Sequence, residues 1–170
     1  MNYKLIGALF VIVGCGGFGF MMVLNHRRKE EMLRQLIDAI TFMEFELQYH
    51  MPALPLLAVS VSKRCRGCVQ SVFGHLSEEL SRQISPDVST CMAAAMSKVP
   101  ELPSKIKTIF QELGKTLGTF DLPGQLKGLE AVRQSCTSEL NSMLQNREVR
   151  LRSYQTLGLC AGAALAVLFI

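Results

Sequence analysis

The chain has 170 residues, of which 49% are hydrophobic and 19% are charged. Soluble domains usually carry about 25% charged residues, so this composition indicates membrane segments and excludes a disordered or collagen-like chain. The formal net charge is +4, yet residues 31–146 hold 11 Lys/Arg against 12 Asp/Glu. A near-neutral centre argues against a nucleic-acid partner, because nucleic-acid binding needs cations spread over a surface.

The first apolar run covers Leu5–Leu24, 20 residues without a charge. A membrane-spanning helix needs about 20 such residues. Arg27, Arg28 and Lys29 follow the run directly, and basic clusters stay on the cytoplasmic side of a membrane. We therefore expect residues 1–25 to form a transmembrane helix and the chain after them to be cytoplasmic.

A lipoprotein signal is the alternative for this end of the chain. Ile12-Val13-Gly14-Cys15 fits the pattern that ends in a lipidated cysteine. The apolar run continues nine residues beyond Cys15, however, and the basic cluster would then have to be exported. An exported protein lipidated at Cys15 stays open as a minority interpretation.

A second apolar run, Leu157–Ile170, ends the sequence after three arginines. Its 14 residues would cover about 21 Å as a helix, less than a hydrocarbon core of about 30 Å. Counted from Ser153, with Tyr154 as an interfacial anchor, it just spans. We expect a membrane helix at residues 154–170 and a helical cytoplasmic domain at residues 26–153.

Small residues recur every four positions in this second run, at Gly158, Gly162 and Ala166. Such an edge lets another helix approach closely, either the first span or a second copy of the chain in a homo-oligomer. Ordinary transmembrane composition explains the same glycines equally well.

The middle of the chain shows helical periodicity throughout, without strand-like alternation. Pro52 and Pro55 separate the first two helices, and Ser85-Pro86-Asp87 predicts a helix start with Ser85 as the cap. We predict an all-α fold: an antiparallel bundle of about six helices between the two membrane segments. Apolar stripes place these helices near residues 33–47, 54–63, 69–84, 87–99, 106–117 and 126–143.

Motifs with catalytic or ligand-binding chemistry are weak. Gly114-Lys115-Thr116 resembles the tail of a phosphate-binding loop, but Ile109 stands where that loop needs a glycine. Cys65 and Cys68 could form a redox or metal site, although they lack the strand context and further ligands of such sites. A helix–helix turn with two reduced thiols is the simpler interpretation. We expect no enzyme activity, cofactor, metal or small-molecule substrate.

The segment Leu113–Gln125 is the candidate pivot of the domain. Gly114 and Gly118 lie one helical turn apart, a spacing that lets another helix approach or the chain turn. Asp121 can cap the return helix ahead of Pro123. We expect Lys115 and Thr116 on an exposed surface that tolerates glutamate, so the segment is either a plain helix–turn–helix or a contact edge for a partner.

Over nearly its full length the chain resembles the stage III sporulation protein AB family of endospore-forming bacteria. The matching residues are Lys4–Ala8, Leu33–Leu36, Met43–Tyr49 and, most specifically, Leu113–Gly118 followed by Asp121 and Gln125. Pro52-Ala53-Leu54 departs from the Thr-Pro-Leu that is usual there, which leaves the start of the second helix open.

The resemblance implies a non-enzymatic membrane component of the channel-like complex between mother cell and forespore. It implies a helical cytoplasmic domain similar to those of type II secretion and type IV pilus platform proteins. The implied partners are a cytoplasmic secretion-type ATPase, which is the AA product of the same operon, and other proteins of that operon. The implied location is the mother-cell membrane around the forespore.

Overall fold

The computed structural model describes residues 27–82, 87–118 and 121–169, with residues 146–169 described through their backbone only. The first span predicted from the sequence, residues 1–25, lies outside these ranges, as does Cys15. The described part contains six helices and no strand, which confirms the all-α prediction. They are a helix over residues 27–49, α2 (Leu54–Arg64), α3 (Gly67–Arg82), α4 (Val88–Ser97), α5 (Ser104–Thr116) and α6 (Leu122–Phe169).

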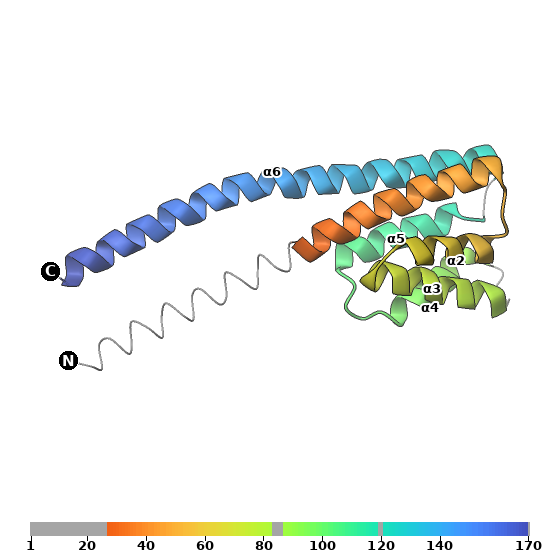
Figure 1. The fold of residues 1–170 in the computed structure, drawn as a ribbon, viewed down its shortest axis with the longest axis horizontal. Coiled ribbons are helices and arrows are strands. Elements are labelled where there is room, and N and C mark those ends of the chain that lie inside the picture. Colours follow the sequence, from red (N-terminus) through yellow and green to blue (C-terminus); the bar gives the residue numbers. More distant parts are fainter. Residues whose placement is uncertain (1–26, 83–86, 119–120, 170) are drawn as a thin grey trace.

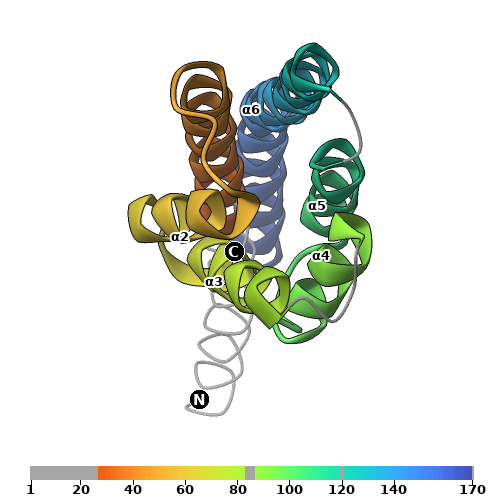
Figure 2. The ribbon, with the colours of Figure 1, turned by 90° about the vertical axis from the view of Figure 1, so that its right-hand side faces the viewer.

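Successive helices are antiparallel, and they lie next to one another around a ring (Figures 1 and 2). α6 closes the ring by lying beside the helix at residues 27–49, where Arg133 Nε bonds the Glu44 carboxylate at 3.2 Å. We call the end from which α6 extends outward the proximal end. The opposite end, which holds the turn at residues 50–53 and the α5–α6 connection, is the distal end (Figure 1).

The core forms where the apolar stripes predicted from the sequence meet. Thirty buried hydrophobic residues of the described chain form one cluster, and they come from all six helices and from the connections after α2, α4 and α5. Phe73 of α3 and Phe110 of α5 meet edge to face at its centre, with ring centroids 5.5 Å apart. Their burial removes two large apolar surfaces from water, and the edge-to-face geometry adds a favourable quadrupole contact.

The start of α4 corrects the sequence prediction. Asp87, not Ser85, is the cap: its carboxylate accepts from the amides of Ser89 and Thr90, each at 3.2 Å. The helix therefore begins at Val88, and Ser85 and Pro86, the predicted cap and first residue, lie outside the described residues. A carboxylate beside two free helix amides favours this later start.

At the C-terminal end, α6 is continuous from Leu122 to Phe169, without a break at the boundary predicted after residue 153. The C-terminal apolar run is thus helical, but it is the last part of α6 rather than a separate short helix. No helix within the described ranges holds a stretch both long and apolar enough to cross a membrane.

Candidate partner-binding end of the bundle

The α5–α6 connection turns at Gly118 and is closed by Asp121. Gly118 has φ +80°, a left-handed conformation that favours glycine. One carboxylate oxygen of Asp121 accepts from the Gly124 amide at 3.3 Å, and its carbonyl accepts from the Gln125 amide at 2.9 Å. The predicted capping role of Asp121 is confirmed.

Gly114 has a different function from Gly118. A Cβ atom at this position would lie 2.8 Å from Cβ of Met92 and 3.3 Å from Cα of Ser89. The missing side chain therefore lets α4 approach the backbone of α5. The sequence left a close approach and a turn as alternatives for the two glycines, and the structure uses Gly114 for the first and Gly118 for the second.

Thr116 corrects the prediction that it lies on an exposed surface. The residue is 9% exposed, and its hydroxyl donates to the Glu112 carbonyl at 3.0 Å. Its methyl group occupies the place that a Cβ at Gly128 would take, so α5 and α6 touch here. The helix period puts Thr116 inward, whereas its neighbour Lys115 is exposed as predicted. Gly128 was missed, because a lone glycine in a helix gives no sign of the helix that it faces.

A hollow of about 320 Å³ opens beside this connection at the distal end. The end of the helix at residues 27–49, the turn after it and the first turns of α2 and α6 enclose it. Met51, in this turn, has φ +46° although it is not a glycine. The residues around the hollow, which we call the distal groove, are Leu47, Met51, Pro52, Ala53, Leu54, Leu122 and Gln125.

Several large apolar side chains stay exposed near the distal groove. Phe45, Tyr49, Met51 and Leu56 are each more than half exposed. The rings of Phe45 and Tyr49 contact each other, with centroids 4.8 Å apart. Of these four residues, Met51 lines the distal groove. An exposed apolar side chain at a groove is typical of protein-binding surfaces. Sequence reasoning missed this feature, because it interpreted Pro52 and Pro55 only as a break between helices.

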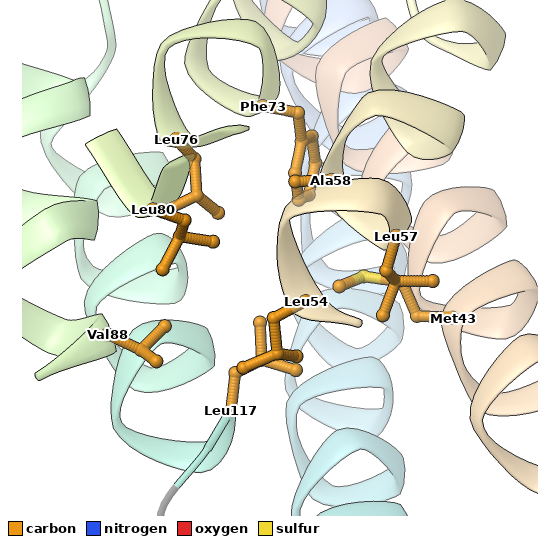
Figure 3. A pocket seen from close by; sticks show the side chains of 9 residues that line it. All are labelled: Met43, Leu54, Leu57, Ala58, Phe73, Leu76, Leu80, Val88 and Leu117. Atoms are coloured by element: carbon orange, nitrogen blue, oxygen red, sulfur yellow. The ribbon is translucent and has the colours of Figure 1, made fainter. Parts of the chain in front are cut away.

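A second cavity lies inside the bundle and has room for nothing larger than a water molecule. Its volume is about 10 Å³, roughly that of one water probe. Figure 3 shows that apolar side chains from four helices and the end of α5 converge on it. It is a seam of the core, lined by Met43, Leu54, Leu57, Ala58, Phe73, Leu76, Leu80, Val88 and Leu117.

The two thiols of the α2–α3 turn differ in their surroundings. Cys65 is buried, and burial together with the charge of Asp38 raises the pKa of its thiol from 9.0 to about 11. Cys68 is half-buried, and both thiols are free. A redox nucleophile needs a lowered pKa, so the environment of Cys65 opposes that interpretation. No group of three or more metal-ligating side chains occurs in the described residues.

The other predicted contact residues, Gly158, Gly162 and Ala166, lie in the backbone-only part of α6. Helical spacing places the three positions along one face of that helix. Their packing stays a prediction.

Comparison with known proteins gives concordant results. The model of the family described as stage III sporulation protein AB matches residues 4–170. The stage III sporulation protein AB of Bacillus subtilis (strain 168) is 25% identical over 170 residues, covering 98% of this chain and 99% of the relative. A solved structure of a stage III sporulation protein AB has a TM-score of 0.65 at 21% identity, over 72% of this chain and 98% of that one. Because the family model matches almost the entire length, the chain belongs to the stage III sporulation protein AB family.

Proposed function

We propose that the chain is a non-enzymatic membrane scaffold of a secretion-like sporulation complex, and that the distal end of its bundle docks a cytoplasmic ATPase. Family membership supports a role in sporulation. The observation that carries the docking site is the distal groove together with Met51, the exposed apolar side chain that lines it.

The architecture supports the choice of the distal end. The predicted membrane segments lie at the two ends of the sequence, and the helices that lead to them both leave the bundle at its proximal end (Figure 1). The distal end is then the part farthest from the bilayer, where a soluble partner has free access. The bundle acts as a spacer between membrane and ATPase in this proposal.

The candidate contact residues of the Leu113–Gln125 segment differ in whether their side chains reach solvent. Lys115 and Asp121 are exposed, whereas Gly114 and Thr116 are covered by α4 and α6. Leu122 and Gln125 line the distal groove itself. The proposed dock is therefore the groove and its rim, with Gly114 and Thr116 holding the shape of the joint from inside.

Direct binding to the purified AA-type ATPase tests the proposal. Met51→Glu places a charge at the mouth of the groove on a side chain that is already 64% exposed, so the fold should persist. We expect binding of the full chain in detergent to weaken at least tenfold, which is about 1.4 kcal/mol. Lys115→Glu, at an exposed residue of α5 that does not line the groove, should weaken it less.

Ala93→Glu is the matched control, because Ala93 is an exposed apolar residue on α4 outside the groove. It should leave ATPase binding unchanged. Equal binding by the native chain and the Met51→Glu variant, with helix content kept in both, would exclude the groove as the dock.

For the membrane part, we propose that the Gly158/Gly162/Ala166 edge packs against the first span or against a second copy. Bulk at such an edge keeps helix backbones apart. Gly162→Ile should therefore weaken assembly in detergent or bilayer without unfolding residues 31–146. Assembly that survives this substitution would leave the glycines as ordinary membrane composition.

A further inference from the structure

We propose that the α2–α3 turn is a second membrane contact, in which Lys63 and Arg66 face the anionic headgroups of the bilayer. This inference rests on the proposed membrane anchoring. It adds a peripheral contact, made by a turn in the middle of the sequence, to the anchors at the two ends.

The first observation is the position of the turn in the fold. It lies at the proximal end of the bundle, the end from which α6 extends outward (Figure 1). The Arg66 amide donates to Gln35 Oε1 at 2.9 Å, which fixes the level of the turn along the first described helix. The chain thus brings a second basic segment to the same end as Arg27, Arg28 and Lys29.

The second observation is that these cations lack the carboxylates that neutralise others. Arg34, Arg82, Lys98, Lys105 and Arg133 all form ion pairs with glutamates. Among the residues that the structure describes, no carboxylate lies within ion-pair distance of the three cations in the turn, although Asp38 is near enough to act on the Cys65 thiol. Arg27, Arg28, Lys29, Lys107 and Lys127 also lack an ion pair among the described residues, and of these Lys107 and Lys127 are single charges.

The helix dipole favours the positions of only two of the three cations in the turn. Lys63 and Arg64 occupy the last turn of α2, where cations are favourable. Arg66 directly precedes the first turn of α3, which has no acidic residue, so this cation stands beside the positive end of a helix dipole. Such an arrangement repels internal cations and attracts an external anion.

The turn is held rigidly while its charges stay in solvent. The Arg64 guanidinium lies 4.0 Å from the centre of the Phe42 ring, and Cys65 is buried beneath the turn. Lys63 and Arg66 are exposed on either side. Because the backbone is already fixed, little conformational entropy would be lost when these side chains meet a surface.

The turn lies close enough to the predicted membrane surface for the charge of the headgroups to reach it. Gln35 lies eight residues into the described helix, about 12 Å along its axis at 1.5 Å per residue. The predicted membrane run ends only three residues before that helix begins. Headgroups add roughly 5–7 Å beyond the hydrocarbon, so the remaining gap is about one Debye length at physiological salt. The potential of an anionic surface falls off over about this distance, so it still attracts long basic side chains that extend from the turn toward the headgroups.

The test compares hydrogen exchange of the full chain in lipid nanodiscs of two compositions. One contains phosphatidylcholine alone, and the other contains phosphatidylcholine with about a third phosphatidylglycerol. We expect the amides of residues 63–70 to exchange at least about threefold more slowly in the anionic discs, and to lose this protection when salt is raised to screen the charges.

Lys63→Gln with Arg66→Gln removes two exposed cations and leaves the Arg64–Phe42 contact in place. This variant should exchange equally in both kinds of disc. The control Lys115→Gln with Lys127→Gln removes two exposed charges from the distal end and should keep the difference.

Equal exchange of the native chain in both discs would overturn the inference, as would protection that persists in the Lys63→Gln/Arg66→Gln variant. Protection produced in neutral discs by inorganic phosphate alone would overturn the choice of lipid as the anion source. If the chain does not co-elute with discs, the proposed anchoring fails as well. If the chain co-elutes with the discs but exchanges equally in both compositions, only the proposed turn contact is contradicted.

Discussion

The two ends of the bundle are built by different physics. At the distal end, α5 packs closely against α4 at Gly114 and against α6 where the Thr116 methyl group contacts Gly128. An apolar groove lies beside this joint. At the proximal end, the α2–α3 turn presents cations that the rest of the described chain does not neutralise. The glycines of the distal joint therefore stabilise contacts within the fold, whereas the charges of the proximal turn are available to a partner outside it, which we propose to be the membrane surface.

The largest effect should follow a charge placed in the distal joint. Thr116→Glu forces a carboxylate into the contact with Gly128, where it is cut off from water. We expect a loss of about 2–4 kcal/mol in the free energy of unfolding. Lys115→Glu, one residue earlier and exposed, should change it by less than about 1 kcal/mol. Urea unfolding of the two variants measures the difference, and equal losses would contradict the buried position of Thr116.

Alanine substitutions at three glycines test whether a close neighbour at the glycine decides the change in stability. Gly114→Ala and Gly118→Ala should each cost about 1–3 kcal/mol, because the new Cβ meets Met92 in the first and Val88 in the second. Gly118→Ala also strains a positive φ. Gly74→Ala, in α3 with nothing within 4 Å of the new Cβ, should instead stabilise the chain by up to about 1 kcal/mol. If all three substitutions destabilised the chain, the room around the new Cβ atom would not decide whether alanine raises or lowers the free energy of unfolding.

Alkaline pH should weaken the core through its buried thiols. Burial raises the pKa of Cys136, like that of Cys65, from 9.0 to about 11. Between these values the unfolded thiol ionises while the folded one stays neutral. Stability is therefore fully present below pH 9 and is lost as the pH rises toward 11. Cys136→Ala should flatten the fall of Tm across this window, and an unchanged slope would count against a buried neutral thiol.

The smallest effect on stability should come from the proximal turn. Lys63→Gln with Arg66→Gln removes two exposed charges without ion pairs, so the free energy of unfolding should stay within about 0.5 kcal/mol of the native value. Thermal unfolding monitored by circular dichroism measures it. A loss above 1 kcal/mol would mean that these side chains serve the fold itself.

Much of the fold follows from the sequence because the apolar stripes have a clear helical period. Leu33, Leu36 and Ile40 are buried as their spacing predicts, and so are Ile109 and Phe110. Local signals also placed the Asp121 cap and the turn at Gly118.

Features that depend on two distant segments could not be predicted in this way. Thr116 faces inward only because Gly128, twelve residues later, brings α6 against it. The distal groove needs the turn after residue 49 to meet the start of α6, and no single stretch of sequence encodes that meeting. The unpaired state of Arg66 likewise becomes visible only when its neighbours in space are known.

Site-specific photo-crosslinking in sporulating cells tests the central claim, that the distal end meets the ATPase while the proximal end meets the membrane. A photoreactive residue would replace Met51 at the distal groove or Arg66 at the proximal turn of the full chain, both of which are exposed. We expect a crosslink to the AA-type ATPase from position 51 and a crosslink to lipid from position 66. An ATPase crosslink from position 66, with none from position 51, would contradict the claim.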